Sequence, residues 1–178
     1  FTRFTHNFLH YDEAIENFTA AINLRHDYAD AWHYRGYVKY FGQQYDDATR
    51  DINKAIEINA LHADAYYVRG LIEFALTNDE KALTAFNQAL EIRPNYADAL
   101  MSRGKVKYYL QRYSEATIDL TRSIEIKPSA DAYYWRGYAN YMLKVDNQAM
   151  ADYTKAIQLK PNYPEALVRR GDLRYIKE

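Results

Sequence analysis

The chain has 178 residues, of which 48% are hydrophobic and 26% charged, a composition typical of one ordinary globular domain. Its 23 basic and 24 acidic side chains give a net charge of −1, so a sequence-wide electrostatic attraction to nucleic acid or to an anionic membrane is excluded. The absence of cysteine excludes disulfides, thiolate metal sites and a cysteine nucleophile, and no apolar run approaches the roughly 20 residues that cross a bilayer.

The beginning of the chain gives an expectation about its context. Phe1 stands where a methionine would be, and no signal-like segment follows it, so we expect the sequence to be a piece of a longer protein. The compartment stays open, and for a soluble chain without a targeting signal we favour the cytoplasm.

Helical patterns of two kinds alternate along the chain, and no strand pattern interrupts them. In chain order we expect helices over residues 11–25, 29–42, 45–58, 63–76, 79–92, 97–110, 113–126, 130–143, 146–159 and 164–176. The helices that begin at 29, 63, 97, 130 and 164 share one pattern and are called first helices here. The others are called second helices.

Five of the six glycines stand at one position of the first helices, although Gly inside a helix costs about 1 kcal/mol relative to Ala. They recur at intervals of 34, 34, 33 and 34 residues, as Gly36, Gly70, Gly104, Gly137 and Gly171. Three prolines follow the same rhythm, each 24 residues after a repeat glycine: Pro94, Pro128 and Pro161, with Ala60 at the equivalent place in the unit of Gly36. A repeat of this length indicates a stack of similar helix pairs.

The second helices carry two small residues with a large one between them, at spacings of four and three that put all three on one helix face. The sets are Ala14, Phe18 and Ala21; Ala48, Ile52 and Ala55; Ala82, Phe86 and Ala89; Ala116, Leu120 and Ser123; and Ala149, Tyr153 and Ala156. Small residues let two helix backbones approach closely. We therefore predict that each repeat glycine lies where a first helix crosses the small residues of its second helix.

Helix pairs of this length, with an aromatic residue, Gly, Ala, a large apolar residue, Ala and Pro in this order, resemble the tetratricopeptide repeat family. The matching residues are Trp32, Gly36, Ala48, Ile52 and Ala55; Tyr66, Gly70, Ala82, Phe86, Ala89 and Pro94; Leu100, Gly104, Ala116, Leu120, Ser123 and Pro128; and Tyr133, Gly137, Ala149, Tyr153, Ala156 and Pro161. The resemblance covers the whole chain, although the third full unit is one residue short and arginine precedes each repeat glycine where the family often has leucine.

The resemblance implies an all-α fold: a right-handed superhelical solenoid of stacked antiparallel helix pairs, with about four full repeats plus partial terminal units. The expected organisation is a single domain over 1–178, in which 1–28 is a partial repeat and 164–178 a terminal or capping helix. The expected full repeats are 29–62, 63–96, 97–129 and 130–163.

The recurrent arginines allow two interpretations. Arg35, Arg69, Arg103, Arg136 and Arg170 on one face could bind a row of phosphates or carboxylates. The second helices, however, offer Asp51, Asp119 and Asp152 at one shared position, with Asn17 and Ala85 at the equivalent places. We favour structural Arg–Asp pairs, because a buried arginine is usually partnered.

The sequence offers no positive case for an enzyme. His6 and His10 are four residues apart and could share a helix face, but no third metal ligand accompanies them. Acidic residues open each first helix, where the positive helix N-terminus explains them without a ligand. Gly-rich phosphate loops and nucleophile elbows are absent. We expect no catalytic residue, no metal and no cofactor.

In the tetratricopeptide repeat family the first helices line a concave groove, and the resemblance assigns that face here. The expected partner-binding residues are His33, Tyr34, Tyr37, Tyr67, Leu71, Met101, Lys105, Tyr134, Trp135 and Tyr138, and the wider lining includes Phe41, Val68, Ser102, Tyr109 and Met142. We assign Tyr40, Phe74, Tyr108 and Tyr141 to the core between repeats. The residues expected to contribute most to binding are Tyr34, Tyr67, Met101, Tyr134 and Trp135, because aromatic side chains serve well as binding anchors.

The resemblance therefore implies a protein-interaction scaffold that binds an extended or helical peptide segment of another protein, and no nucleic acid or membrane. The carboxylate clamp of the family's heat-shock co-chaperones is missing, since the matching places hold His33, Tyr37, Val68, Asp98 and Ser102. An apolar or aromatic segment suits this lining better. The alternative is an assembly module, possible as a homo-oligomer, that acts through exposed apolar faces at the ends of the solenoid.

Overall fold

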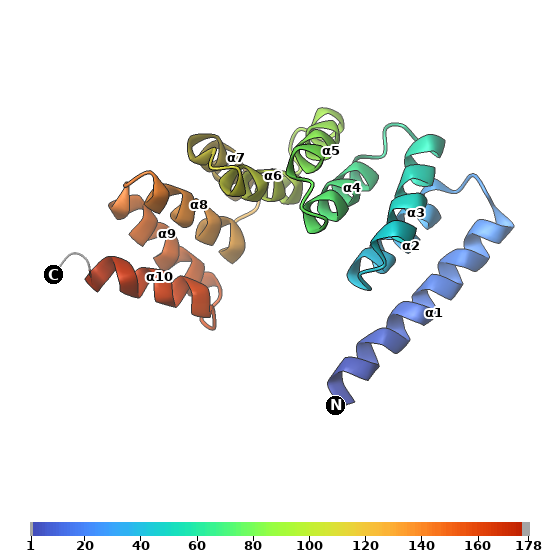
Figure 1. The fold of residues 1–178 in the computed structure, drawn as a ribbon, viewed down its shortest axis with the longest axis horizontal. Coiled ribbons are helices and arrows are strands. Elements are labelled where there is room, and N and C mark those ends of the chain that lie inside the picture. Colours follow the sequence, from blue (N-terminus) through green and yellow to red (C-terminus); the bar gives the residue numbers. More distant parts are fainter. Residues whose placement is uncertain (1, 176–178) are drawn as a thin grey trace. The chain divides into compact units, whose positions relative to one another are not determined.

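The computed structural model describes residues 2–175, with side chains from residue 11 onward, and within them the chain forms ten α-helices and no strand. Figure 1 shows the helices in chain order. They are α1 (Thr2–Leu24), α2 (Ala29–Phe41), α3 (Tyr45–Ile58), α4 (Ala63–Ala75), α5 (Asp79–Ile92), α6 (Ala97–Tyr109), α7 (Tyr113–Ile126), α8 (Ala130–Met142), α9 (Asp146–Leu159) and α10 (Pro164–Tyr175). None of these described helices is both long and apolar enough to cross a membrane.

The helices group into two compact units, Phe1–Pro94 and Asn95–Glu178, which we call unit 1 and unit 2. Unit 1 contains α1 to α5 and unit 2 contains α6 to α10. The single domain over 1–178 and its repeat boundaries stay predictions, although each predicted full repeat contains one helix pair.

The helix bounds follow the predicted pattern closely, with small differences at the ends. Helix α1 begins at Thr2 rather than at residue 11, because no Gly or Pro interrupts the preceding residues. The first four first helices end one residue earlier than predicted, since the backbone turns left-handed shortly afterwards. The left-handed residues are Gln43, Thr77, Gln111 and Lys144, with φ between 59° and 63°.

The repeat glycines mark the closest approach within four helix pairs. A Cβ added at Gly36 would lie 2.9 Å from the Ile52 side chain, and one at Gly70 would lie 2.5 Å from the Phe86 ring. The corresponding distances are 2.8 Å from Gly104 to Leu120 and 2.9 Å from Gly137 to Tyr153. Any side chain at these four positions would therefore force the facing large side chain or its helix to shift.

The prediction is wrong for the fifth glycine. An added Cβ at Gly171 would meet nothing within 4 Å. The reason is that no second helix follows α10 within the described residues, so this glycine has no helix to cross.

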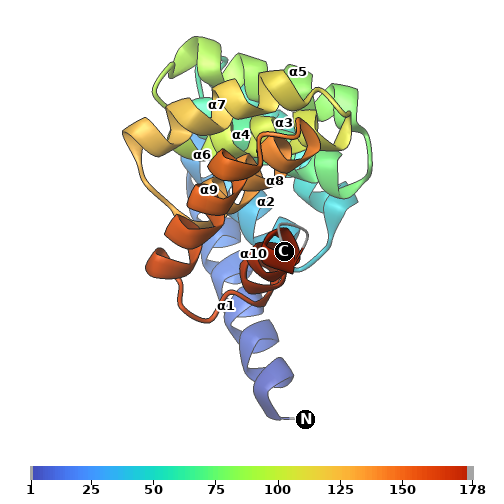
Figure 2. The same ribbon diagram turned by 90° about the vertical axis from the view of Figure 1, so that its left-hand side faces the viewer.

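The core of each unit consists of the small–large–small sets of the second helices. In α3, α5, α7 and α9, the large residues Ile52, Phe86, Leu120 and Tyr153 are fully buried, and the small residues on either side of them are buried as well. Adjacent pairs then stack: α3 packs against α4 in unit 1, and α7 against α8 in unit 2. Figure 2 shows α8, α9 and α10 of unit 2 from the side, and α10 packs against α9.

The predicted Arg–Asp pairs are confirmed in three helix pairs. Arg35 donates two hydrogen bonds to Asp51, at 2.8 and 2.7 Å. Arg103 makes the same bidentate hydrogen bonds to Asp119, and Arg136 makes them to Asp152. A second donor completes each carboxylate: Lys39 on Asp51, Lys107 on Asp119 and Asn140 on Asp152. These arginines are structural, and their carboxylate partners leave them no role in a phosphate row.

Candidate functional site

Four aromatic side chains form a continuous cluster on the first helices of unit 2. They are Tyr108 and Tyr109 of α6 and Trp135 and Tyr138 of α8, and we call them the α6–α8 aromatic surface. The Trp135 ring centroid lies 5.5 Å from that of Tyr108 and 5.6 Å from that of Tyr109, and Tyr108 stacks on Tyr138 at 4.7 Å. Tyr109 is 51% exposed and the other three rings are half-buried, so the cluster offers aromatic surface to solvent.

Two cations flank this surface. The Lys105 ammonium lies 5.0 Å from the centre of the Trp135 ring. On the other side the Arg169 guanidinium of α10 lies 4.7 Å from the Tyr138 ring centre and donates a 2.9 Å hydrogen bond to the Tyr138 hydroxyl. Burial lowers the pKa of Lys105, and nearby Asp131 opposes this shift. The surface therefore combines ring faces with positive charge, which suits a ligand that carries an apolar group close to a carboxylate.

Tyr108, at the centre of the surface, keeps its proton. Burial, followed by the hydrogen bond with Tyr138, raises the pKa of Tyr108 above its ordinary value. A neutral hydroxyl group can donate a hydrogen bond to a peptide carbonyl, so this surface can also recognise backbone.

The structure brings three predicted residues of unit 2, Lys105, Trp135 and Tyr138, together at this surface. Met101 is half-buried and packs against the core formed by α7 and α8. Tyr134 is only 8% exposed, because it packs among Trp135, Tyr153 and Tyr163 at ring distances of 5.1 to 6.1 Å. The Tyr134 ring packs against the Trp135 ring, and little of the Tyr134 side chain is left for a ligand to contact.

Arg169 is the residue of this surface that sequence reasoning missed. It stands 34 residues after Trp135, so the repeat interval places both residues at the same position of a first helix. The 34-residue interval could therefore have identified Arg169 from the sequence. The recurrent arginine named from the sequence was instead its neighbour Arg170, which precedes the repeat glycine.

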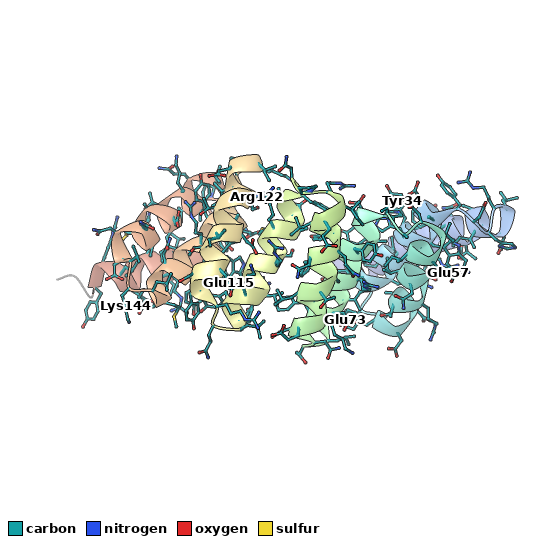
Figure 3. All side chains as sticks on the ribbon, turned by 90° about the horizontal axis from the view of Figure 1, so that it is seen from above. Tyr34, Glu57, Glu73, Glu115, Arg122 and Lys144 are labelled. Carbon is teal, nitrogen blue, oxygen red and sulfur yellow. The ribbon has the colours of Figure 1, made fainter. Side chains whose placement is uncertain are left out.

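Unit 1 carries a set of aromatic side chains on α2, two of which are half-exposed. Tyr34 and Phe41 are each 50% exposed, and Tyr34 is labelled in Figure 3. Tyr37 lies edge-on to Phe41 at 4.8 Å and stacks on Tyr40 at 6.4 Å. On α4, Tyr67 and Leu71 are half-buried, and Tyr67 leans on the Phe86 ring at 6.0 Å. The predicted residues of unit 1 thus lie on two helices that contact each other.

His33 lies beneath this group and cannot serve as a surface contact. It is 6% exposed, and its ring lies 4.8 Å from that of His62. Burial and the neighbouring His62 lower the pKa of His33 to about 4, so the ring is neutral at pH 7. The other side of His62 approaches Asp30, with Nε2 3.1 Å from a carboxylate oxygen.

The described side chains contain no group of three or more His, Asp or Glu residues that could hold a metal ion. The side chains of His6 and His10 lie outside the described residues, so the metal alternative for that pair stays untested.

A polar hollow on another side of unit 2 was not anticipated. It has a volume of about 330 Å³ and is lined by Thr117, Thr121, Arg136, Asn140, Gln148, Ala151 and Asp152. Because Arg136 and Asn140 both donate to Asp152, the charges of this hollow already compensate one another. The hollow is therefore a poor site for a charged ligand.

Comparison with known proteins places the sequence among repeat proteins. A family model described as TPR repeat matches residues 70–111, and one described as tetratricopeptide repeat matches residues 101–164. No curated protein sequence matches the chain significantly.

Solved structures resemble the chain in fold. YrrB, described as a TPR protein with an unusual peptide-binding site, is 23% identical, with 92% of this chain and 85% of YrrB covered and a TM-score of 0.73. TTC0263, a TPR protein of Thermus thermophilus, is 18% identical, with 96% and 94% covered and a TM-score of 0.76. PilF from Pseudomonas aeruginosa is 23% identical, with 84% and 68% covered and a TM-score of 0.79. At these identities the likeness concerns the fold alone.

Proposed function

The chain belongs to the tetratricopeptide repeat family, whose repeats form protein-interaction scaffolds, and we propose that it binds a peptide segment of another protein at the α6–α8 aromatic surface. The two family matches together span residues 70–164, which is just over half of the chain. The similar fold of YrrB, a TPR protein with an unusual peptide-binding site, supports the same class of ligand.

One observation carries the proposal: the Trp135 ring has the half-exposed Tyr109 ring at 5.6 Å and the Lys105 ammonium at 5.0 Å from its centre. Tryptophan and tyrosine provide large contact areas at a low entropic cost, and they are enriched among residues that dominate binding energy. The buried Tyr134 ring packs edge-on against the Trp135 ring, so the Trp135 side chain needs little further ordering when a ligand binds.

The charges around the surface define the ligand more closely. Lys105 and Arg169 bring two positive groups beside the rings. A segment with an aromatic or large apolar side chain and a carboxylate close to it would satisfy both. An extended strand can donate and accept hydrogen bonds with the tyrosine hydroxyls, whereas an amphipathic helix would contact only the rings. We favour the extended segment.

The α2 surface of unit 1 is a second contact region in this proposal. Tyr34, Tyr37 and Phe41 supply rings, of which Tyr34 and Phe41 are half-exposed, and Tyr67 and Leu71 supply half-buried apolar area on α4. Because this lining is aromatic and aliphatic, we assign the region to apolar side chains of a partner.

The proposal is tested by selecting displayed peptides on the intact chain and then titrating one selected peptide calorimetrically. Trp135→Ala is expected to weaken binding by at least about fivefold, the effect of removing an anchor worth about 1 kcal/mol. Tyr175→Ala is the matched control, because Tyr175 is 84% exposed and lies at the end of α10. Full affinity in both Trp135→Ala and Tyr109→Ala would reject the surface as the binding site.

A further inference from the structure

The polar hollow between α7, α8 and α9 occupies a place that the α6–α7 pair fills with an ion pair. Its volume is about 330 Å³, near the lower end of the range for small-ligand sites. In the α6–α7 pair, the Lys107 ammonium lies 2.9 Å from Asp119 and 3.5 Å from Glu115. The positions equivalent to Lys107 and Glu115, counted from the repeat glycine, hold Asn140 and Gln148 in the α8–α9 pair. A charged pair is thus exchanged for two neutral amides.

Two further differences enlarge the space. Leu83 of α5 is buried one repeat before the position of Thr117 of α7, which lines the hollow. Ile118 stands one repeat before Ala151 of α9, which also lines it. Both exchanges remove carbon atoms from the lining, so the α8–α9 pair has a hollow that is both wider and less charged.

The lining offers donors and acceptors without a net charge. Arg136 donates two hydrogen bonds to Asp152, at 3.0 and 2.6 Å, which neutralises the carboxylate. Asn140 donates to Asp152 at 3.1 Å, and its amide carbonyl is an acceptor. The Thr121 hydroxyl accepts from Arg136 at 3.2 Å and keeps its own O–H as a donor. Gln148 is exposed and offers both groups.

This chemistry selects an uncharged ligand group that donates and accepts at once. A carboxylate would lie against Asp152 and an ammonium group against Arg136, and either would lose hydration without gaining a counter-charge. The residues that line the hollow include no aromatic ring on which a sugar could stack. A primary carboxamide has an NH₂ donor and a C=O acceptor side by side, so it matches the lining.

An exposed apolar side chain beside the hollow indicates how the carboxamide is carried. A second hollow of about 440 Å³ on α7 shares Thr117 and Thr121 with the first and is also lined by Ile118. Ile118 is 68% exposed. An apolar residue next to the carboxamide in a protein segment would cover it, whereas a free small amide would leave it in water. These contacts favour a protein segment.

We propose that the hollow between α7, α8 and α9 binds a glutamine side chain of a protein segment, whose neighbouring apolar residue covers Ile118. The ligand NH₂ donates to the Asn140 carbonyl oxygen, and the ligand C=O accepts from the Thr121 hydroxyl. Glutamine has the longer of the two carboxamide side chains and reaches the buried Asn140 from the surface. The site shares no residue with the α6–α8 aromatic surface, so it goes beyond the proposed function and does not depend on it.

The experiment follows the side-chain NH₂ signals of the isotope-labelled chain by NMR while a capped, neutral Leu-Gln-Leu peptide is added. We expect the signals of Asn140 and Gln148 to shift until saturation, and by more than that of Gln158, which is exposed on α9. The same peptide with glutamate in place of glutamine should bind at least about tenfold more weakly, because its carboxylate approaches Asp152. Propionamide, which cannot cover an apolar side chain, should also bind at least about tenfold more weakly.

Two variants fill the hollow in the way that the α6–α7 pair does. Ala151→Ile gives α9 the side chain that α7 has at the equivalent position, and Asn140→Lys combined with Gln148→Glu restores the ion pair. Each is expected to weaken peptide binding by at least about tenfold. Ala20→Ile is the matched control, since Ala20 is an exposed alanine of α1, and it should leave the affinity unchanged. Circular dichroism checks that the variants fold.

Four results would overturn the proposal. Shifts that grow in proportion to the peptide concentration without saturating would mean that the hollow holds water only. Equal affinity for the glutamine and glutamate peptides would reject carboxamide recognition. Undiminished binding by both filled variants would place the peptide elsewhere. Propionamide binding as tight as that of the peptide would reject a protein segment as the ligand.

Discussion

Units 1 and 2 share one helix-pair frame but carry different chemistry on their first helices. In unit 1, α2 places the buried His33 beneath Tyr34 and Tyr37, 4.8 Å from the ring of His62. In unit 2, α8 places Trp135 between rings, with Lys105 stacked on it. All five histidines of the chain belong to unit 1. The contrast shows that the glycines and small residues set the helix spacing, whereas the other first-helix positions are free to acquire different functions.

The helix pairs themselves differ in one respect. Three of them hold an aspartate with two donors, but the α4–α5 pair of unit 1 has Ala85 at that position, and its Arg69 donates to Gln88 instead. The α4–α5 pair nevertheless packs as closely as the others, with Phe86 fully buried. The ion pair is therefore one way of filling this position and is not a condition for helix pairing.

The largest expected effect concerns the aspartate that three helix pairs have and the α4–α5 pair lacks. Asp119→Ala removes a carboxylate that accepts from both Arg103 and Lys107, at 2.8 and 2.9 Å, and leaves two cations without it in a mostly buried place. We expect the free energy of unfolding to fall by about 3–5 kcal/mol in urea titrations. Arg69→Met in unit 1 should cost only about 1 kcal/mol, because its partner Gln88 is neutral. Equal losses in the two variants would contradict the assigned role of the carboxylate.

Acid should destabilise unit 1 selectively. The folded-state pKa of His33 is about 4, below the ordinary 6.5, so the unfolded chain binds the proton more readily between these values. Stability is therefore complete above about pH 6.5 and falls as the pH drops toward 4, by roughly 3 kcal/mol in total. Asp30 and Asp64 oppose the shift and His62 adds to it.

Trp32 and Trp135 are the two tryptophans of the chain, one in each unit, so their fluorescence reports on each unit separately. With Trp135→Phe, the remaining signal of Trp32 should show the pH dependence, and His33→Leu should remove most of it. The same pH dependence in His33→Leu would assign it to another group.

A third test compares the glycines. Gly104→Leu should lower the free energy of unfolding by about 1–3 kcal/mol, because the new side chain must enter the contact with Leu120. Gly171→Leu, measured at low concentration, should leave the stability unchanged or slightly raised, since leucine is the better helix former and the site is open. A melting temperature of Gly104→Leu equal to that of the parent would disprove the close-packing account.

The smallest expected effect concerns the contribution of Lys105 to peptide binding by unit 2. Lys105→Gln removes the cation stacked on Trp135, and we expect a carboxylate-containing selected peptide to lose about 0.5–1 kcal/mol of binding free energy. Lys155→Gln is the matched control, because Lys155 is exposed on α9. If both variants lost the same affinity, the loss would reflect the overall charge rather than the aromatic surface.

Much of the fold follows from the sequence because the repeat interval encodes it. The 34-residue spacing located the helix pairs, the glycine contacts at Gly36, Gly70, Gly104 and Gly137, and the pairing of Arg103 with Asp119. These features depend on residues within one helix pair, which the periodicity describes directly. The contact predicted at Gly171 is absent because the helix that contains it has no second helix after it within the described residues, as the predicted terminal helix over 164–178 already implied.

The candidate site was less predictable because neighbouring repeats decide which ring is exposed. Tyr134 and Trp135 are adjacent aromatics, yet Tyr134 is buried by Tyr153 of α9 and by Tyr163 before α10. Tyr108, predicted to belong to the core, does pack against the core residues Ala116, Leu120 and Ala139, but its ring also stacks on Tyr138 within the surface. Side-chain packing between repeats leaves no periodic signature in the sequence.

The most direct test of the central claim is a two-dimensional NMR spectrum of the tryptophan indole N–H groups during titration of a selected peptide. The chain has only Trp32 and Trp135, and the Trp32 indole donates to the His26 carbonyl of unit 1 at 2.9 Å. If the peptide binds at the α6–α8 aromatic surface, the Trp135 signal should shift progressively until saturation, and by more than the Trp32 signal. A saturating peptide that moves Trp32 and leaves Trp135 unchanged would contradict the account.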